Sequence, residues 1–491
     1  MQVVWFKRDL RLEDHAPLCA ALNGAPVLLL YVFEPELWGD PHYSERHWRF
    51  VAQSLLEMTE RLEPLGHRIR IVEGAVLDAL SDIAEHTAIT TLYSYQETGL
   101  RRTYDRDLGV ARWCQDRAIP WHEFQSNGVQ RGRTHRRGWA KAWQQFMAQP
   151  MDSPDWGALA KIEPKVTFKR VDEWGAERLR SSAEPVSVWE QVGGVAQANA
   201  VLDSFFGGRL ANYHRSLSKP TLSRKHCSRI SPYLAWGNVS VRQVYQRLLQ
   251  EQARQGKSRA LSAFNSRLHW HCHFIQKFEA EDRIEFEPMN SGYDQFDDPW
   301  NERNEQAWIE GRTGLPYVDA CLRCVQQTGY LHFRGRAMLV SVLCHLLGGR
   351  WQVAARHLAQ WFLDFEPGIH YAQIQMQVGL TGINTLRIYN PVKQGQDHDP
   401  DGVFIRKWVP ELRSLQGAIV HRPWLLGPIE RASLELDYPE PCVDVEEAHR
   451  AARQTFWARR QNPLVLQEVK RVLYRHVEQD SFRTVSRSRR R

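Results

Sequence analysis

The chain has no apolar run long enough to cross a membrane and too few cysteines for a disulfide framework. Its longest apolar runs, such as PVLLLYVF at 26–33, are far shorter than the ~18–20 residues of a membrane span. Eight cysteines are scattered over 491 residues, which indicates reduced thiols. The N-terminus, MQVVWFKRDL, lacks the pattern of a secretory signal, so we expect a cytoplasmic protein with no membrane contact.

Familiar metal and nucleophile motifs are also missing. The sequence contains no phosphate-loop Gly-Lys-Thr motif and no nucleophile elbow. Cys321 and Cys324 have CxxC spacing, but they lie in an apolar helical pattern without a second pair, which argues against an iron–sulfur cluster. His269, His271 and His273 alternate along a predicted helix, where residues two apart point in different directions. We therefore predict no metal site.

Positive charge is concentrated at the C-terminus. Residues 481–491, SFRTVSRSRRR, carry five arginines and no acid, within a formal net charge of +7 for the whole chain. This tail is predicted to be disordered. It either binds phosphate groups or is a solvated end without a function. The remainder is only mildly basic, which is compatible with nucleic acid without demanding it.

Short β-rich runs alternate with helical patterns over residues 1–128. Strands are predicted at 3–6, 27–33, 68–74, 90–95 and 120–124, and helices near 46–63, 76–86 and 103–117. This alternation predicts an α/β domain with a parallel, Rossmann-like sheet that is covered on both faces.

The pattern changes after residue 128. Residues 129–200 are predicted to be a connector, in which RGRTHRRGWAKAWQQF (131–146) either contacts a nucleic-acid backbone or forms a solvated linker. Helical periodicity dominates 201–480, for example at 239–255 and 264–281. The predicted fold class is therefore an α/β domain followed by a larger all-α domain.

Three groups of motifs carry a family resemblance. Residues 311–412 open with GRTGLPYVDACLRCVQQTGYLHFRGRAML and close with RIYNPVKQGQDHDPDGVFIRKWVPEL. Residues 213–240 read YHRSLSKPTLSRKHCSRISPYLAWGNVS, and the chain starts with VVWFKRDLRLEDHAPL. In this order the motifs closely resemble those of the DNA photolyase/cryptochrome flavoproteins, of which the chain is an off-type, class I-like member.

The resemblance implies FAD in the helical domain. The implied cofactor-binding residues are Tyr213, Ser228, Arg229, Ile230, Ser231, Phe264, Arg267, His271, Arg336, Phe362 and Asp364. Hydroxyls, backbone N–H groups and an arginine at a helix start suit a pyrophosphate, although Ser-Arg-x-Ser-Pro alone is also an ordinary helix cap. The resemblance leaves open a second, antenna chromophore, because relatives use a folate, a deazaflavin, a flavin or none.

Four residues are implied for catalysis: Trp270, Arg336, Asp364 and His332. Trp270 would support the damaged base pair, and either Asp364 or Glu366 is expected to pair with Arg336 beside the flavin ring. His332 is interpreted either as a proton donor or as a packed histidine.

Several positions depart from the family pattern. Arg267 replaces a glutamate, Phe333 and Gly368 each replace an asparagine, and Ala372 replaces the tryptophan nearest the flavin. The region around Pro367-Gly368 is expected to break a helix. For electron transfer the resemblance leaves Trp351, Trp300 and Tyr371, and for DNA binding it implies Arg267, Trp270, Phe333, Arg334 and Gln394.

The predicted function is light-dependent DNA repair. Flavin-mediated electron transfer would split cyclobutane pyrimidine dimers in single- or double-stranded DNA that carries UV lesions, with the protein acting as a monomer. The alternative is a cryptochrome-like blue-light photoreceptor without repair activity, which Arg267 and Phe333 favour.

Overall fold

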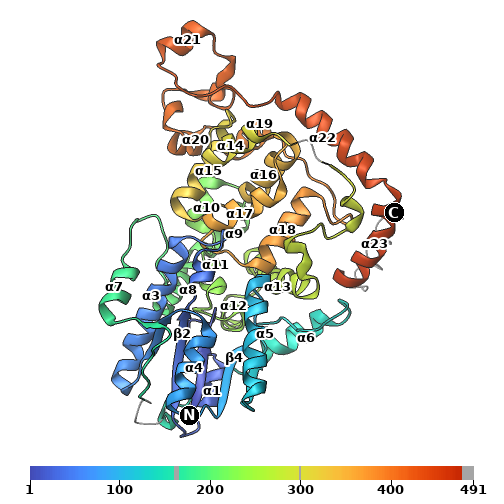
Figure 1. The fold of residues 1–491 in the computed structure, drawn as a ribbon. Coiled ribbons are helices and arrows are strands. Elements are labelled where there is room, and N and C mark those ends of the chain that lie inside the picture. The colour runs from blue at the N-terminus through green and yellow to red at the C-terminus, as the bar shows by residue number, and fades with distance from the viewer. Residues whose placement is uncertain (160–164, 298–299, 478–491) are drawn as a thin grey trace.

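The computed structural model describes residues 1–159, 165–297 and 300–477. An α/β layer carries the N-terminus, and a larger body of helices rests on it (Figure 1). This arrangement confirms the predicted fold class. The basic tail, 481–491, lies outside the described residues.

One sheet forms the centre of the N-terminal domain. Its strands are β1 (Gln2–Phe6), β2 (Val27–Phe33), β3 (Ile69–Glu73), β4 (Thr91–Tyr95), β5 (Trp121–Phe124) and β6 (Asp172–Glu173). They are ordered β5-β4-β1-β2-β3-β6, and all neighbours are parallel except β6, which is antiparallel to β3. The prediction missed this edge strand because two acidic residues in a connector give no β signal.

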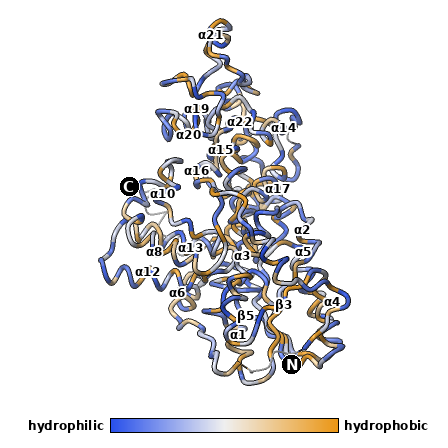
Figure 2. The backbone as a smooth tube through the Cα atoms, turned by 90° about the vertical axis from the view of Figure 1, so that its left-hand side faces the viewer, coloured by the Kyte–Doolittle hydropathy of each residue, from blue (hydrophilic) through white to orange (hydrophobic). Residues whose placement is uncertain are grey.

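Helices cover both faces of the sheet, as predicted. They are α1 (Ala16–Ala21), α2 (Pro35–Trp38), α3 (Glu45–Leu62), α4 (Val76–His86) and α5 (Arg101–Asp116). Alternate residues of β1 enter different cores: Val4 packs with the α3 side, whereas Val3 packs with the α4 and α5 side. The apolar strands run as orange segments among bluer helices in Figure 2.

The connector packs against both domains. It contains α6 (Trp139–Ala148) and α7 (Ala176–Ala183). Trp139 and Trp143 of the basic stretch are buried, and each ring centroid lies 5.0 Å from that of His269. The tryptophans therefore serve the core, and neither predicted role of this stretch describes them.

The C-terminal domain contains helices and no strand among its described residues. Its helices are α8 (Val195–Gly207), α9 (Tyr213–Ser216), α10 (Pro220–His226), α11 (Ser231–Ala235), α12 (Val241–Gln255), α13 (Arg259–Ala280), α14 (Glu302–Glu310), α15 (Pro316–Thr328), α16 (Phe333–Ser341), α17 (Trp351–Trp361), α18 (Pro367–Val378), α19 (Pro391–His398), α20 (Val403–Trp408), α21 (Pro428–Ser433), α22 (Val445–Arg460) and α23 (Pro463–His476). The predicted boundary between residues 200 and 201 falls inside α8.

Short 3₁₀ turns connect many of these elements. They are Glu63–Leu65, Trp156–Ala158, Arg209–Asn212, Asp282–Glu285, Ser291–Tyr293, Pro410–Leu412, Gly417–His421 and Pro423–Leu425. One π-helical turn, Val342–Leu346, prolongs α16, and the chain then leaves the helix at Gly348 with a φ of 68°. Gly348 thus ends the helix where the Gly-Gly pair predicted a stop.

Helices α13 and α18 pack closely in the middle of the domain. Pro367 is the first residue of α18, a position at which proline's missing N–H costs nothing. A Cβ on Gly368 would lie 2.7 Å from the Cα of Ile275, so only glycine fits this crossing. Pro367-Gly368 therefore starts α18, directly after the interruption that separates this helix from the end of α17 at Trp361.

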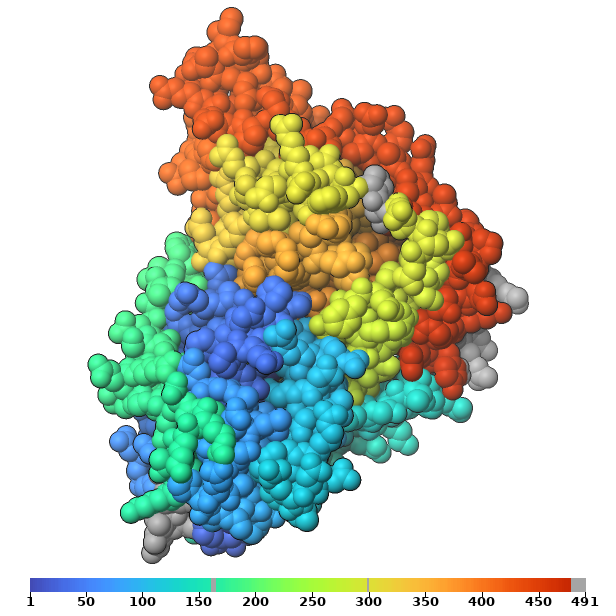
Figure 3. Space-filling model, viewed as in Figure 1, coloured from blue at the N-terminus to red at the C-terminus, as the bar shows by residue number. Residues whose placement is uncertain are grey.

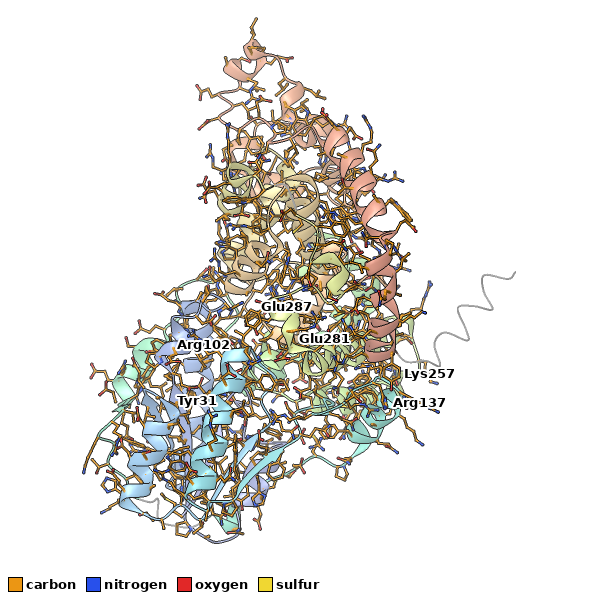
Figure 4. All side chains as sticks on the ribbon, turned by 45° about the vertical axis from the view of Figure 1, so that its right-hand side comes forward. Tyr31, Arg102, Arg137, Lys257, Glu281 and Glu287 are labelled. Atoms are coloured by element: carbon orange, nitrogen blue, oxygen red, sulfur yellow. The ribbon has the colours of Figure 1, made fainter. Side chains whose placement is uncertain are left out.

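Helix α23 forms hydrogen bonds with Glu281, at the C-terminal end of α13. Glu281, labelled in Figure 4, accepts from His476 Nε2 at 2.6 Å and from Arg471 Nη1 at 2.8 Å. Figure 3 shows the blue N-terminal elements directly against the yellow and orange helical body. Among the described residues, no helix has both the length and the apolar composition that crossing a bilayer requires.

Candidate functional site

An inner cavity of about 310 Å³ lies between α13, α16 and α18. The segment after α10 and the loop between α17 and α18 complete its wall. Most of the predicted cofactor contacts and several other predicted site residues meet there: Tyr213, Ser228, Arg229, Ser231, Arg267, Trp270, His271, Phe333, Arg336, Phe362 and Asp364. Residues as far apart in sequence as Tyr213 and Asp364 thus form one wall.

Arg336 and Asp364 form a two-pronged ion pair on this wall. Arg336 Nη1 donates to Asp364 Oδ1 at 2.9 Å, and Nη2 donates to Oδ2 at 3.0 Å. The Phe362 ring packs against the Arg336 guanidinium, whose Cζ lies 4.0 Å from the ring centroid. Burial would raise the pKa of Asp364, but Arg336, together with the Ser231 hydroxyl, holds that pKa below its ordinary value. Asp364, and not Glu366, is therefore the partner of Arg336.

Arg229, which lines the same cavity, has an unused hydrogen-bond donor. Its guanidinium lies 3.6 Å from the Tyr330 ring centroid, and its Nε donates to Gln191 at 3.0 Å. Among the described residues no atom accepts from its buried Nη1. Its backbone is left-handed, with a φ of 62°, a conformation that non-glycine residues keep only when their surroundings require it. A buried cation with a spare donor suits an anionic group.

Glu366 has a different partner, which the sequence did not reveal. Arg8, just beyond the carboxyl end of β1, reaches into the helical domain, and its Nη2 donates to Glu366 Oε2 at 2.7 Å. Arg8 Nε also donates to the Ala235 carbonyl at 3.2 Å. The pair joins the two domains directly behind the cavity, where Glu366 is part of the lining.

Both predicted site histidines are uncharged at neutral pH. Burial, with Arg8 nearby, lowers the pKa of His271 to about 4. Burial and the neighbouring His398 lower the pKa of His332 to about 3. His332 lies outside the cavity lining, 3.5 Å from the Tyr317 hydroxyl, as a packed histidine does.

A second, outer cavity of about 550 Å³ adjoins the first and shares part of its wall. Its lining consists of Arg267, Trp270, His273, Phe274, Lys277, Phe333, Gln373, Met376, Gln377, Asn384, Thr385 and Arg387. Among these described residues are three cationic side chains and no carboxylate. Burial, with Arg136 nearby, lowers the pKa of Lys277 to about 8, so most of its amines remain charged at neutral pH.

Two aromatic side chains stand where the cavities meet. Trp270 is 41% exposed and Phe333 is 45% exposed. The Arg267 guanidinium lies between them, 4.4 Å from the Trp270 ring centroid and 5.6 Å from that of Phe333. The two departures from the family pattern, Arg267 and Phe333, therefore contact each other at the entrance.

The remaining predicted site residues are not part of either cavity lining. They are Ile230, Phe264, Arg334 and Gln394 among the cofactor and DNA contacts, and Trp300, Trp351 and Tyr371 among the electron-transfer residues. Phe264 packs behind Tyr213, at a ring distance of 5.9 Å. Trp300 is half exposed and lies against Arg350, whereas Tyr371 is buried in α18.

The sheet domain has little room for a second chromophore. A cavity of about 40 Å³ lies beyond the carboxyl ends of β1 and β2, lined by Trp5, Tyr31, Trp48, Arg106 and others. At this size the cavity would have to open before it could take a ring system. The antenna chromophore stays a prediction.

Several lining residues had no signal in the sequence. Tyr330, Phe274, Gln373 and Lys277 lie on the same helices or loops as predicted site residues, but nothing local marks them as facing a cavity. Spacing of three and four residues from Trp270 would have found Phe274 and Lys277 together. No group of three metal-ligating side chains occurs in the described part of the chain, His269, His271 and His273 included.

Comparison with known proteins is consistent with this geometry. Residues 2–148 match the model of "DNA photolyase", and residues 264–458 match that of the "FAD binding domain of DNA photolyase". The chain is 30% identical to a deoxyribodipyrimidine photo-lyase of Vibrio cholerae over 482 residues, 90% of this chain and 96% of the relative.

Two further matches come from Synechocystis. The chain is 27% identical to its cryptochrome DASH over 92% of this chain and 97% of the relative. The crystal structure of a Synechocystis cryptochrome superposes with a TM-score of 0.81 at 23% identity, covering 92% of this chain and 98% of that one. Similarity thus extends over both domains and to both photolyases and cryptochromes.

Proposed function

Because the chain belongs to the DNA photolyase/cryptochrome family, we propose that it is an FAD-dependent DNA photolyase that splits cyclobutane pyrimidine dimers under blue light. The observation that carries this proposal is the outer cavity. It opens beside the inner one, and its described lining has three cations and no carboxylate. Such a surface suits a polyanion such as DNA, whose backbone dominates the affinity of proteins for it.

The inner cavity fits a flavin dinucleotide. Its wall is mainly apolar and aromatic, and the unpaired Arg229 Nη1, with the Ser228 and Ser231 hydroxyls, suits a pyrophosphate. Bound there, FAD would supply light absorption and a single transferable electron. Arg336, fixed by Asp364, would place a positive charge against the ring system.

The chain's own residues would prepare the substrate. Trp270 offers an exposed aromatic face to a base that has left the duplex, and base–aromatic stacking contributes about 1–3 kcal/mol per base. Arg267 covers part of that face, so it would have to turn toward a phosphate as the base enters. Lys277 and Arg387 also line the outer cavity, where they would hold the flanking backbone.

Illumination of defined substrates tests the proposal. Reduced, flavin-loaded protein is exposed to blue light with single- and double-stranded oligonucleotides that contain one dimer, and dark samples serve as blanks. We expect the dimers to disappear only in the light. Unchanged dimers in both kinds of oligonucleotide would contradict photolyase activity.

A matched pair of variants identifies the binding face. Trp270→Leu removes the stacking platform and should weaken binding of the dimer-containing strand about tenfold or more. Trp457→Leu removes another exposed tryptophan, on α22 and outside both cavity linings, and should leave binding unchanged. Equal effects of the two changes would mean that the cavity entrance is not the binding site.

A blue-light photoreceptor without repair activity is the second candidate, and Arg267 favours it. A guanidinium cannot accept the hydrogen bonds that a carboxylate at this position would accept from a pyrimidine dimer. Under this alternative the dimers persist, while light changes the flavin spectrum and the protein's susceptibility to proteolysis. Arg267→Glu would then bring dimer binding without removing the light response.

A further inference from the structure

Three side chains from distant parts of the chain form a hydrogen-bonded series beside the inner cavity. Tyr371, in α18, is only 3% exposed, and its hydroxyl lies 2.5 Å from Nε2 of His42. His42 Nδ1 lies 2.6 Å from Oδ1 of Asp40. The backbone N–H of His42 also donates to this oxygen, at 3.0 Å, which fixes the carboxylate and the imidazole relative to each other.

The chemistry of Asp40, His42 and Tyr371 indicates which of them donates and which accepts in each hydrogen bond. Burial would raise the pKa of Asp40, but hydrogen bonds from the His42 ring and backbone hold that pKa below its ordinary value, so Asp40 is an acceptor only. His42 Nδ1 therefore donates to Asp40, and in the neutral imidazole the Nε2 lone pair accepts from the phenol. Burial, with Glu285 and Asp40 nearby, raises the pKa of Tyr371 well above its ordinary value. The phenol thus keeps its proton at rest.

Aromatic contacts connect this series to the cavity wall. The His370 ring, which lines the inner cavity, lies 5.6 Å from that of Tyr371 and perpendicular to it. Phe365, also in the lining, stacks on His42 with centroids 5.7 Å apart and planes inclined by 10°. Tyr371 is therefore one ring away from the cavity, whereas its neighbour Ala372 has no ring to offer.

The other end of the series reaches the surface. Arg102 Nε lies 3.7 Å from Asp40 Oδ2, and the Arg102 side chain is 48% exposed (labelled in Figure 4). A proton released from the buried phenol thus has a path of two hydrogen bonds to a carboxylate near solvent. Packing alone would not need this path, since a phenylalanine would fill the same apolar space.

We propose that Tyr371, with His42 and Asp40, is a proton-coupled electron donor to the inner cavity. Tyr371 gives one electron to a one-electron oxidant, which under the proposed function is the light-excited, oxidised isoalloxazine of FAD. The phenolic O–H bond breaks, and the proton forms an N–H bond at His42 Nε2. Tyr371 becomes a neutral phenoxyl radical, and the His42 imidazolium is paired with the Asp40 carboxylate. Return of one electron and this proton restores the resting state.

An external oxidant tests the redox site without relying on flavin or DNA. Full-length protein is oxidised by a flash-generated ruthenium(III) polypyridyl complex, and radicals are followed by transient absorption and electron paramagnetic resonance. We expect a tyrosyl radical that forms more slowly in D₂O. It should disappear in Tyr371→Phe and persist in Tyr293→Phe, which alters another buried tyrosine.

The role of His42 is tested separately from the fold. His42→Gln should slow radical formation at Tyr371 by about a hundredfold, as expected for loss of a positioned base, and should abolish the D₂O effect. Added imidazole should restore part of the rate, which a purely structural role of His42 would not allow. An unchanged radical in Tyr371→Phe, or an unchanged rate and isotope effect in His42→Gln, would overturn the proposal.

Failure of this site is distinguishable from failure of the proposed function. Dimer repair in the light with no radical at Tyr371 would overturn the electron-donor role alone. A His42-dependent radical under chemical oxidation, in a protein whose flavin spectrum does not respond to light, would support the redox site and overturn the photochemical function.

Discussion

Arg336→Ala would leave a buried carboxylate without its partner. Asp364 is nearly inaccessible to solvent, whereas about a quarter of the Arg336 side chain is exposed. Removing one member of a buried pair costs about 3–5 kcal/mol. Because solvent partly screens this pair, we expect the lower end, a loss of about 3 kcal/mol of unfolding free energy at neutral pH.

The loss of unfolding free energy should be larger at neutral pH than at acidic pH. In the wild type the depressed pKa of Asp364 contributes stability above the unfolded value, about 3.9, and this contribution is lost as the pH falls through the folded pKa. Without Arg336, burial raises that pKa, so the variant is penalised for ionising Asp364. The difference in unfolding free energy between the wild type and the variant should therefore be largest near pH 7 and should decrease below about pH 4.

Urea unfolding followed by tryptophan fluorescence measures this difference. A double-mutant cycle with Asp364→Ala isolates the pair, and we expect a coupling energy of about 2–3 kcal/mol. Arg101→Ala is the control, because Arg101 pairs with Asp105 at 2.9 Å and both side chains are 55% exposed, so solvent screens this pair and the expected loss is much smaller. A cycle with no coupling, or a loss that does not change with pH, would refute the reasoning.

The other predictions concern the cofactor, the helix crossing and DNA. Arg336→Ala should release FAD or destabilise its reduced state; a yellow, photoreducible variant would contradict that role. Gly368→Asn should lower the unfolding free energy by about 1–3 kcal/mol by overpacking, as urea unfolding would show, whereas unchanged stability would mean that the helices separate freely. Lys277→Met should lower the salt slope of single-strand binding by about 0.7 per lost phosphate contact, whereas Lys257→Met, in an exposed loop (Figure 4), should not. Deleting residues 481–491 should also flatten this slope, and an unchanged slope would show that the tail is a solvated end.

Residues that match the family pattern and residues that depart from it occur together around the two cavities. The Arg336–Asp364 pair lines the inner cavity, with the Phe362 ring packed against the guanidinium. At the entrance, Arg267 and Phe333 contact each other, so the two substitutions act on one surface. Substrate preference is therefore expected to respond to changes at this entrance more than to changes around the ion pair.

The sequence by itself determined the fold class and most of the inner cavity. Strands and helices follow from the local period of apolar residues, and the observed β2, Val27–Phe33, agrees with the predicted range. The motifs indicated Arg336 and Asp364 as site residues because their segments are recognisable without knowledge of the packing, and both line the inner cavity. Even the departures, such as Arg267 and Gly368, could be identified from the motifs.

Tertiary structure alone decided the contacts between segments far apart in sequence. Tyr371 and His42 are 329 residues apart, and nothing in either local sequence indicates that their side chains meet. The same holds for the Arg8–Glu366 pair across the domains. The physical reason is that secondary structure depends on neighbours a few residues away, whereas such pairs depend on how whole helices cross. At the α13–α18 crossing, a glycine allows an approach that no sequence period encodes.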